Sequence, residues 1–276
     1  MRTYLAEFLA DPRVVELPRW LWLPILHGIV LRKRPAQSAA KYAKIWTAEG
    51  SPLALHTRRQ AQLLREATGL PVEYAMRYGE PGIAAALRKL PGKVRVLPMY
   101  PQYARSTTES IRDVVGGGAD FVEQFHDHPG YIAALAALVE ERPDVLVMSF
   151  HGLPQRAVDR GDPYQAQCLR TAELLAAALG LRKEAYRVTF QSRFGPARWL
   201  QPYTSEVLAE LGAARTRRVH VICPGFVADC LETLEEIAIE GKKIFLDAGG
   251  GEFRALPCLN ESPRWIAALQ DIALGR

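Results

Sequence analysis

The feature that most constrains the fold of this chain is an apolar run at residues 218–223 that leads directly into an acidic segment. The run reads RVHVIC, and such nearly continuous apolar stretches are typical of parallel strands that are buried on both faces. A second run of this kind occurs earlier in the chain, at 145–150. Because apolar runs alternate with helix-like segments, the sequence predicts an α/β fold whose parallel sheets are covered by helices on both faces.

The alternation forms two successive series. In the first series we expect helices at 59–68 and 82–90 and strands at 52–57, 72–78 and 94–99. In the second we expect strands at 145–150, 186–191, 219–223 and 252–256, and helices at 163–179, 204–211 and 227–240. Glycines 116–118 and a helix at 131–141 separate the two series. We therefore predict an N-terminal domain over 1–118, a C-terminal domain over 119–258, and a final segment, 259–276, whose helix packs back across the domains.

Composition limits the kind of protein. A length of 276 residues suits one large domain or two medium ones, and 49% hydrophobic with 24% charged residues is ordinary for a folded soluble protein. No apolar run reaches 18 residues and the N-terminus lacks a signal-peptide core, so we expect a cytoplasmic protein. The net charge of +5 is mild and fits an acidic partner, but no basic stripe points to nucleic acid.

Two common kinds of cofactor site find no support in the sequence. The four cysteines contain no CxxC pair, which argues against a disulfide framework or a zinc ribbon. Neither glycine cluster, at 116–118 or 249–251, fits the dinucleotide pattern G-x-G-x-x-G after a strand, so no nucleotide cofactor is expected.

The predicted helix at 227–240 carries three carboxylates at a spacing of four residues, Glu232, Glu236 and Glu240. In an α-helix they would stack on one face over roughly 12 Å. Like charges stacked in this way destabilise a helix, and no Lys or Arg is interposed. One interpretation is a solvated acidic face, and the other is a row of carboxylates that binds a cation or moves protons.

His151 and Asp229 each follow a predicted strand directly. Ligands of open parallel sheets bind beyond the carboxyl ends of the strands, where both side chains are expected. A neutral imidazole serves as a metal ligand or as a base, whereas a structural, hydrogen-bonded histidine is the alternative. Asp229 has a competing role as a helix N-terminal cap. We assign the histidines at 126 and 128 to a connecting loop, although their spacing suits a metal.

Several longer motifs occur in a fixed order. They are LPMYPQY at 97–103, SFHGLP at 149–154, RGDPYQ at 160–165, FQSRFGP at 190–196, WLQPYT at 199–204 and PGFVADCLETLEE at 224–236. Together they resemble the ferrochelatase family, over about residues 4–269. The resemblance implies two Rossmann-like domains with four-stranded parallel sheets and a cleft for protoporphyrin IX. It implies a lyase that inserts ferrous iron, its substrate, to make protohaem in the last step of haem biosynthesis.

The resemblance also implies roles for individual residues. His151 and Glu232 match the metal-binding and catalytic positions, and Asp229 matches an acid that supports them. Glu236 and Glu240 become a candidate relay for protons or metal. The candidate porphyrin contacts are Arg34, Tyr42, Ser51 and Tyr100. Some ferrochelatases carry an iron–sulfur cluster on a cysteine-bearing C-terminal extension, and no such cluster is expected for this chain.

Residues 20–31 are unusually apolar for a segment near a terminus, and Arg32, Lys33 and Arg34 follow at once. One interpretation is a core helix. The other is a lip that contacts the inner membrane surface peripherally, with the basic residues pairing with propionates or lipid phosphates. The family usually begins with an apolar strand and a Gly-rich loop before the helix that starts here at Met1. Either the protein lacks this strand, or the start was placed too late in the gene; we expect the second, with the segment encoded upstream.

Two alternative functions stay open. A related chelatase acting on coproporphyrin, or inserting cobalt, would share the fold, although such proteins usually carry histidine pairs at the metal site. A non-catalytic porphyrin- or haem-binding protein would need no proton acceptor, which the combination of His151, Asp229 and Glu232 argues against.

Overall fold

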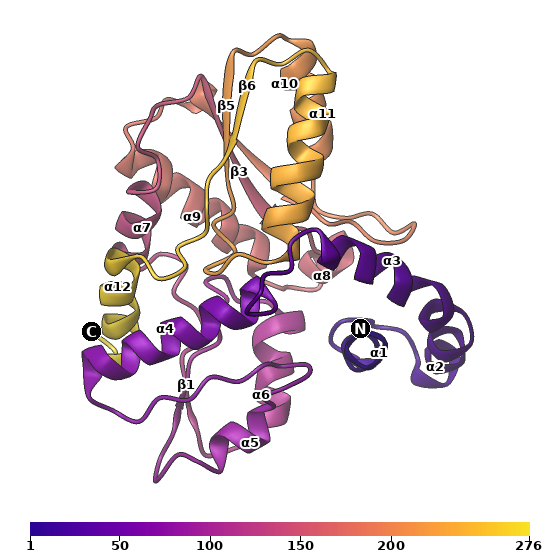
Figure 1. Cartoon of the computed structure of the whole chain (residues 1–276), viewed down its shortest axis with the longest axis vertical. Helices are drawn as coiled ribbons and strands as arrows, with labels where there is room; N and C mark the ends of the chain where they lie inside the picture. The colour runs from indigo at the N-terminus through magenta and orange to yellow at the C-terminus, as the bar shows by residue number, and fades with distance from the viewer. The chain divides into compact units, whose positions relative to one another are not determined.

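The computed structural model describes all 276 residues, which form two compact units (Figure 1). The first unit comprises residues 1–98 and 104–123, and the second comprises 99–103 and 124–276. The predicted division at residue 118 stays a prediction. No helix combines the length and the apolar character needed to cross a bilayer.

The second unit is built on a four-stranded, wholly parallel sheet in the order β4-β3-β5-β6. Its strands are β3 (Val145–His151), β4 (Tyr186–Gln191), β5 (Arg218–Ile222) and β6 (Glu252–Ala255). All four strands predicted in this part of the sequence are confirmed. The α/β class is therefore confirmed, and the carboxyl ends of β3, β4 and β5 meet at one edge of the sheet.

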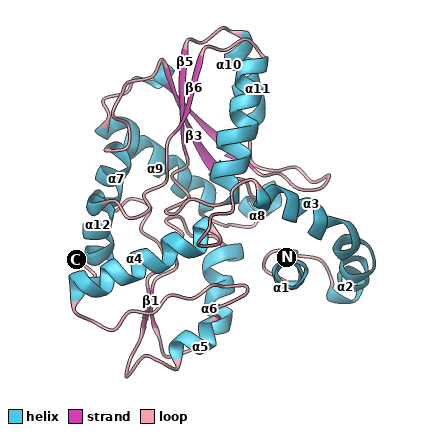
Figure 2. Cartoon of the chain, viewed as in Figure 1, coloured by secondary structure: helices cyan, strands magenta, loops and turns pink.

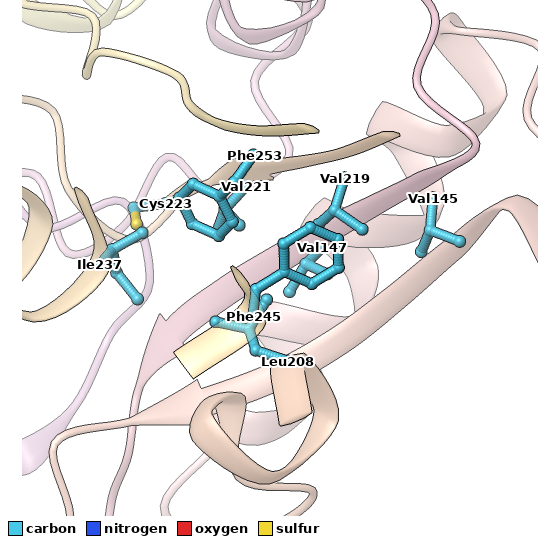
Figure 3. Close-up of a cluster of buried hydrophobic side chains, with 9 residues drawn as sticks. All are labelled: Val145, Val147, Leu208, Val219, Val221, Cys223, Ile237, Phe245 and Phe253. Carbon is cyan, nitrogen blue, oxygen red and sulfur yellow. The ribbon is translucent and has the colours of Figure 1, made fainter. Parts of the chain in front are cut away.

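Helices cover both faces of this sheet (Figure 1). They are α7 (Pro129–Ala136), α8 (Gln155–Asp159), α9 (Tyr164–Ala178), η3 (Lys183–Ala185), α10 (Thr204–Ala213), η4 (Glu232–Gly241), α11 (Lys242–Asp247) and α12 (Pro263–Leu274). Alternate residues of β3 and β5 pack with Leu208, Ile237 and Phe245 in one apolar cluster (Figure 3). This cluster fixes α10, η4 and α11 against one face, and α12 packs on α7.

The first unit is mostly helical, with one short pair of parallel strands (Figure 2). Its elements are α1 (Arg2–Ala10), α2 (Arg19–Ile25), η1 (Leu26–Val30), α3 (Leu31–Ala43), α4 (Pro52–Thr68), α5 (Ile83–Leu87), β1 (Arg95–Val96), η2 (Arg105–Glu109), α6 (Ser110–Val115) and β2 (Asp120–Phe121). The expectation of four strands in this unit is wrong, because its sheet has two.

The strand predicted at 52–57 is the first part of α4. Ser51 takes the N-cap position and Pro52 the first helical position, where proline's fixed φ favours a helix. Buried residues then recur at helical spacing, at Leu55, Ala61 and Leu64. At 72–78 no strand forms, and a single bridge joins Met76 to Gly82.

A buried carboxylate anchors the first unit. Asp11, just after α1, accepts hydrogen bonds from Arg77 at 2.6 Å, from Tyr78 at 2.8 Å and from Ser110 at 2.5 Å. The side chain of Asp11 is 3% exposed and that of Arg77 is 21% exposed, so this ion pair is shielded from solvent. Burial raises the pKa of Tyr78, which therefore stays a neutral donor.

The acidic helix differs from the predicted α-helix. Residues Glu232–Gly241 form a π-helix, η4, that continues into α11. In a π-helix the backbone bonds run from i to i+5, so the α-helical rise behind the predicted 12 Å span does not apply. Glu232, Glu236 and Glu240 are all half-buried, which removes the interpretation of a solvated acidic face. Long π-helices are rare. The π-helical turns that proteins do contain are often found at functional sites.

Candidate metal and proton-transfer site

His151 is the last residue of β3 and lies half-buried at the carboxyl edge of the second sheet. Its ring nitrogen Nδ1 lies 2.7 Å from the carbonyl oxygen of Gly152. Because a carbonyl only accepts hydrogen bonds, Nδ1 carries a proton, and in the neutral ring Nε2 keeps the lone pair. Metal-binding histidines are commonly held in this way, so the ring is set up as a ligand or a base.

Gly152 lets two chain segments approach closely beside His151. Its N–H donates to the carbonyl of Gln191 at 2.7 Å, and a Cβ at this position would stand 2.8 Å from that oxygen. Leu200 likewise donates to Leu153 at 2.9 Å. The motifs at 149–154, 190–196 and 199–204 therefore form one structural unit at the edge of the sheet, which explains the glycine after the histidine.

The motif at 160–165 holds the backbone of His151 in place. The carboxylate of Asp162 accepts the backbone N–H of Tyr164 at 3.0 Å, which fixes the turn into α9. The Tyr164 hydroxyl then donates to the carbonyl oxygen of His151 at 2.9 Å. Burial raises the pKa of Tyr164 well above its usual value, so the phenol remains protonated as this donor.

Gln191 joins the sheet to η4. Its side-chain oxygen accepts from Ser149 at 2.6 Å, and its Nε2 donates to the backbone carbonyl of Glu232 at 3.0 Å. The amide thus connects the end of β4 to β3 and to the first residue of the π-helix. Glu232 is in this way held near the strand edge that carries His151.

The carboxylate of Glu236 is held by Ser192. It accepts the backbone N–H of Ser192 at 2.8 Å and also the Ser192 hydroxyl. Ser192 has a φ of 65°, in the left-handed region, and this uncommon conformation accompanies the placing of both donors on one carboxylate. A cavity of about 130 Å³ adjoins it, lined by Phe190, Gln191, Ser192, Arg193, Tyr203, Thr204, Ser205 and Glu236.

Two opposing effects act on the pKa of Glu236. Burial, the largest, raises the pKa, and the negative charge of Glu232 raises it further. The hydrogen bonds from Ser192 and the nearby His151 act in the opposite direction, but the net shift is upward. Since both His151 and Glu232 contribute, the structure brings the predicted histidine and two of the predicted carboxylates into one electrostatic site.

Asp229 lies in the connection before η4 rather than in the helix. Its carboxylate accepts from Thr233 at 2.9 Å, from Asn260 Nδ2 at 2.7 Å and from the Cys258 N–H at 3.3 Å. Its own N–H donates to Asn260 Oδ1 at 2.9 Å. No side-chain cap is found at the start of η4, so the N-cap alternative for Asp229 is wrong. The residue joins the start of η4 to the segment after β6.

The remaining predicted residues lie on separate elements. Tyr100 belongs to the 99–103 segment of the second unit and is 39% exposed. Arg34 and Tyr42 lie half-buried on α3 of the first unit, and Ser51 precedes α4. Glu240 lies near the end of η4. The structure thus groups His151, Glu232 and Glu236, while the roles of all these residues stay predictions.

Tyr164, Gln191 and Ser192 lie inside the sequence motifs, but the sequence alone indicates no function for them. The structure shows that these residues hold the backbone of His151 and Glu232 and the carboxylate of Glu236. Their signal was their position at or just after the end of a predicted strand, or at the start of a predicted helix. It was not enough to name their partners, which lie 13 to 44 residues away in sequence.

Solved structures with the same fold define the class. SirB from Bacillus subtilis, in a structure with Fe³⁺, superposes with a TM-score of 0.58 at 14% identity, covering 81% of this chain and 92% of that one. CbiX, the terminal enzyme for siroheme biosynthesis in denitrifying bacteria, gives 0.55 at 16% identity, covering 82% and 94%. The chain therefore has the α/β fold of chelatases.

Sequence relatives give the family. The ferrochelatase family model matches residues 1–276. A ferrochelatase of Chromobacterium violaceum is 54% identical over 297 aligned residues, covering 99% of this chain and 82% of that protein. One from Azoarcus sp. is 55% identical over 293 residues, covering 98% and 81%. The chain belongs to the ferrochelatase family, for which iron is the metal substrate.

Proposed function

We propose that this chain inserts ferrous iron into protoporphyrin IX and so makes protohaem. The observation that carries the proposal is the pairing of His151, with its Nε2 lone pair available, with Glu232 and Glu236 at the carboxyl edge of the second sheet. Membership of the ferrochelatase family supports the same activity.

Insertion exchanges two pyrrole protons for one ferrous ion, so the site must hold a divalent cation and accept protons. Imidazole nitrogen and carboxylate oxygen together suit ferrous iron, a borderline metal ion. In the proposed mechanism His151 Nε2 and the Glu232 carboxylate hold the incoming ion. Asp229 acts as a positioning residue, because it holds the start of η4 through Thr233 and Asn260.

Glu236 is the proposed proton acceptor next to this pair. Its raised pKa makes the carboxylate a stronger base than an exposed glutamate, which favours taking a proton from the porphyrin. Ser192 stabilises the charged carboxylate of Glu236 by donating two hydrogen bonds to it. Glu240, further along η4, would pass the proton outward.

Arg34, Tyr42, Ser51 and Tyr100 are the proposed porphyrin contacts. We expect neither a nucleotide nor an iron–sulfur cluster to take part. All four cysteines are buried, and burial raises the pKa of each thiol, which disfavours the thiolates that a cluster needs. Nucleic acid is not an expected partner, given the mild net charge of +5.

We further propose peripheral contact with an anionic membrane, on the cytoplasmic side of the inner membrane. In the helical stretch from α2 to α3, Trp22, Leu26 and Leu31 lie in a buried apolar cluster of the first unit. Other apolar residues of the same stretch are exposed to solvent. Trp20 is 79% exposed and Ile29 is 63% exposed. Exposed aromatic and aliphatic groups beside Arg32 and Lys33 fit a membrane surface.

The activity is tested by a spectroscopic insertion assay on the purified chain. We expect His151→Ala to abolish insertion while porphyrin binding persists, and His128→Ala to serve as a control that keeps activity. Ordinary activity in a folded His151→Ala protein would disprove the assignment of His151.

The same assay separates the alternatives. Coproporphyrin and Co²⁺ are offered in place of protoporphyrin IX and Fe²⁺, and a clear preference for either would favour a related chelatase. Tight porphyrin binding without any insertion would instead indicate a non-catalytic binding protein.

A further inference from the structure

A second group of potential metal ligands lies toward the amino ends of the strands of the second sheet, whereas His151 lies at their carboxyl ends. Its members are Glu141 in the connection before β3, His220 in β5 and Glu252 at the start of β6. One potential ligand atom from each residue lies within 4.8 Å of the other two. The three residues come from three separate segments that only the folded sheet brings together.

His220 is the residue of this cluster that indicates a bound ligand. The side chain is fully buried, and neither ring nitrogen has a hydrogen-bond partner. Its neighbours Val219 and Val221 point into the apolar cluster under α10 and α11, so the alternation of the strand directs His220 to the opposite face. An imidazole buried with two unsatisfied nitrogens is costly unless something binds it.

The electrostatic surroundings keep the imidazole in its metal-binding form. Burial lowers the pKa of His220, Arg254 and Arg218 lower it further, and Glu252 and Glu141 oppose the shift. The ring is therefore neutral near pH 7 and keeps a lone pair. Glu141 and Glu252 are exposed, which gives an ion a path from solvent.

The nearby arginines compete with a metal ion. Arg218 Nε donates to Glu252 Oε2 at 3.1 Å, and Arg254 lies 3.8 Å from Glu140. Both arginine side chains are partly exposed and can turn toward solvent, and Glu252 has a second carboxylate oxygen to offer. These charges reduce the affinity of a cation but do not occupy His220.

We propose that Glu141, His220 and Glu252 form a second metal site that binds a divalent transition-metal ion such as Zn²⁺. One imidazole and two carboxylates are ligands that zinc accepts, with water completing the shell. The ion would tie the connection before β3 to β5 and β6 and would satisfy His220. This site does not depend on the proposed iron insertion.

Zinc binding to the His151→Ala protein tests the proposal, because that background removes the proposed insertion site. We expect one zinc ion to bind, measured by equilibrium dialysis, and the melting temperature to rise by about 5 °C at zinc concentrations about 100-fold above Kd. Glu141→Gln should weaken binding at least about tenfold, since loss of even an outer-sphere partner of a metal ligand commonly costs that much. Its neighbour Glu140→Gln, with the same charge change, should leave binding intact.

His220→Asn should remove the binding, and crystals soaked in Zn²⁺ should show an anomalous peak among the three side chains. Glu141 is exposed, so its variant folds even if the buried His220→Asn protein does not. Absence of zinc binding in the His151→Ala protein, or equal losses in the Glu140→Gln and Glu141→Gln proteins, would overturn the proposal.

Discussion

Glu232 tests the proposed chemistry at the scale of a single residue. Glu232→Gln keeps the shape of the side chain and removes its charge, so insertion should fall by about 10² or more if the carboxylate binds iron or accepts protons. The measurement is kcat in the insertion assay with ferrous iron. Glu210→Gln, an exposed carboxylate on the neighbouring α10, is the matched control.

Glu235, on the same helix, is a poor control for Glu232. Its side chain is only 1% exposed, so Glu235→Gln changes a buried group. Equal losses in Glu232→Gln and Glu210→Gln would show that the acidic helix has no special role.

Glu236 gives a prediction on pH. Burial raises its pKa above the usual 4.5, so the folded state holds the proton more tightly than the unfolded chain. The stability from this group is therefore full below pH 4.5 and is lost as the pH rises through the folded pKa. Glu236→Gln should remove that loss, so the variant gains stability relative to the parent as the pH rises above 4.5.

The same substitution should slow insertion by about tenfold or more, because the amide cannot accept a proton. Urea unfolding at a series of pH values, together with the insertion assay, measures both effects. A variant whose stability relative to the parent falls as the pH rises would contradict the sign of the shift.

At the scale of elements, the carboxylate of Asp11 joins α1 to α6 and to the segment around Arg77. Asp11→Ala removes the acceptor that Arg77, Tyr78 and Ser110 share. The loss should cost about 3 kcal/mol, the lower end for a buried pair, because Arg77 keeps some solvent and its bonds to Ser110. Asp113→Ala, which breaks the exposed pair with Arg13, should cost less than about 1 kcal/mol.

Urea unfolding followed by tryptophan fluorescence measures the two losses, since Trp22 is buried in the same unit. Similar losses for the two variants would mean that the Asp11 network contributes no more than a surface pair.

At the scale of the whole molecule, the membrane proposal predicts co-sedimentation with anionic vesicles at low salt and release at high salt. Replacing both Arg32 and Lys33 by Ala should weaken binding roughly 30-fold, at about 1 kcal/mol for each charge. Trp20→Ser should weaken it as well, through lost apolar contact.

Leu70→Ser serves as the control, because Leu70 is 52% exposed in the same unit but lies outside the proposed contact. Absence of binding at low salt, or an equal effect of Leu70→Ser, would leave only the core-helix interpretation of 20–31.

The sequence by itself determined the second sheet, since the nearly continuous apolar runs at 145–150 and 218–223 are typical of strands buried on both faces. It also placed His151 at a strand end. Only the tertiary structure decided that Pro52 begins a helix and that Glu232 begins a π-helix. The spacing of residues in the sequence does not separate i→i+4 from i→i+5 bonding, so the π-helix is seen only in the folded structure. Ser192, which holds Glu236, and the carboxylates near His220 likewise come from distant segments, which meet only when the sheet buries its apolar faces.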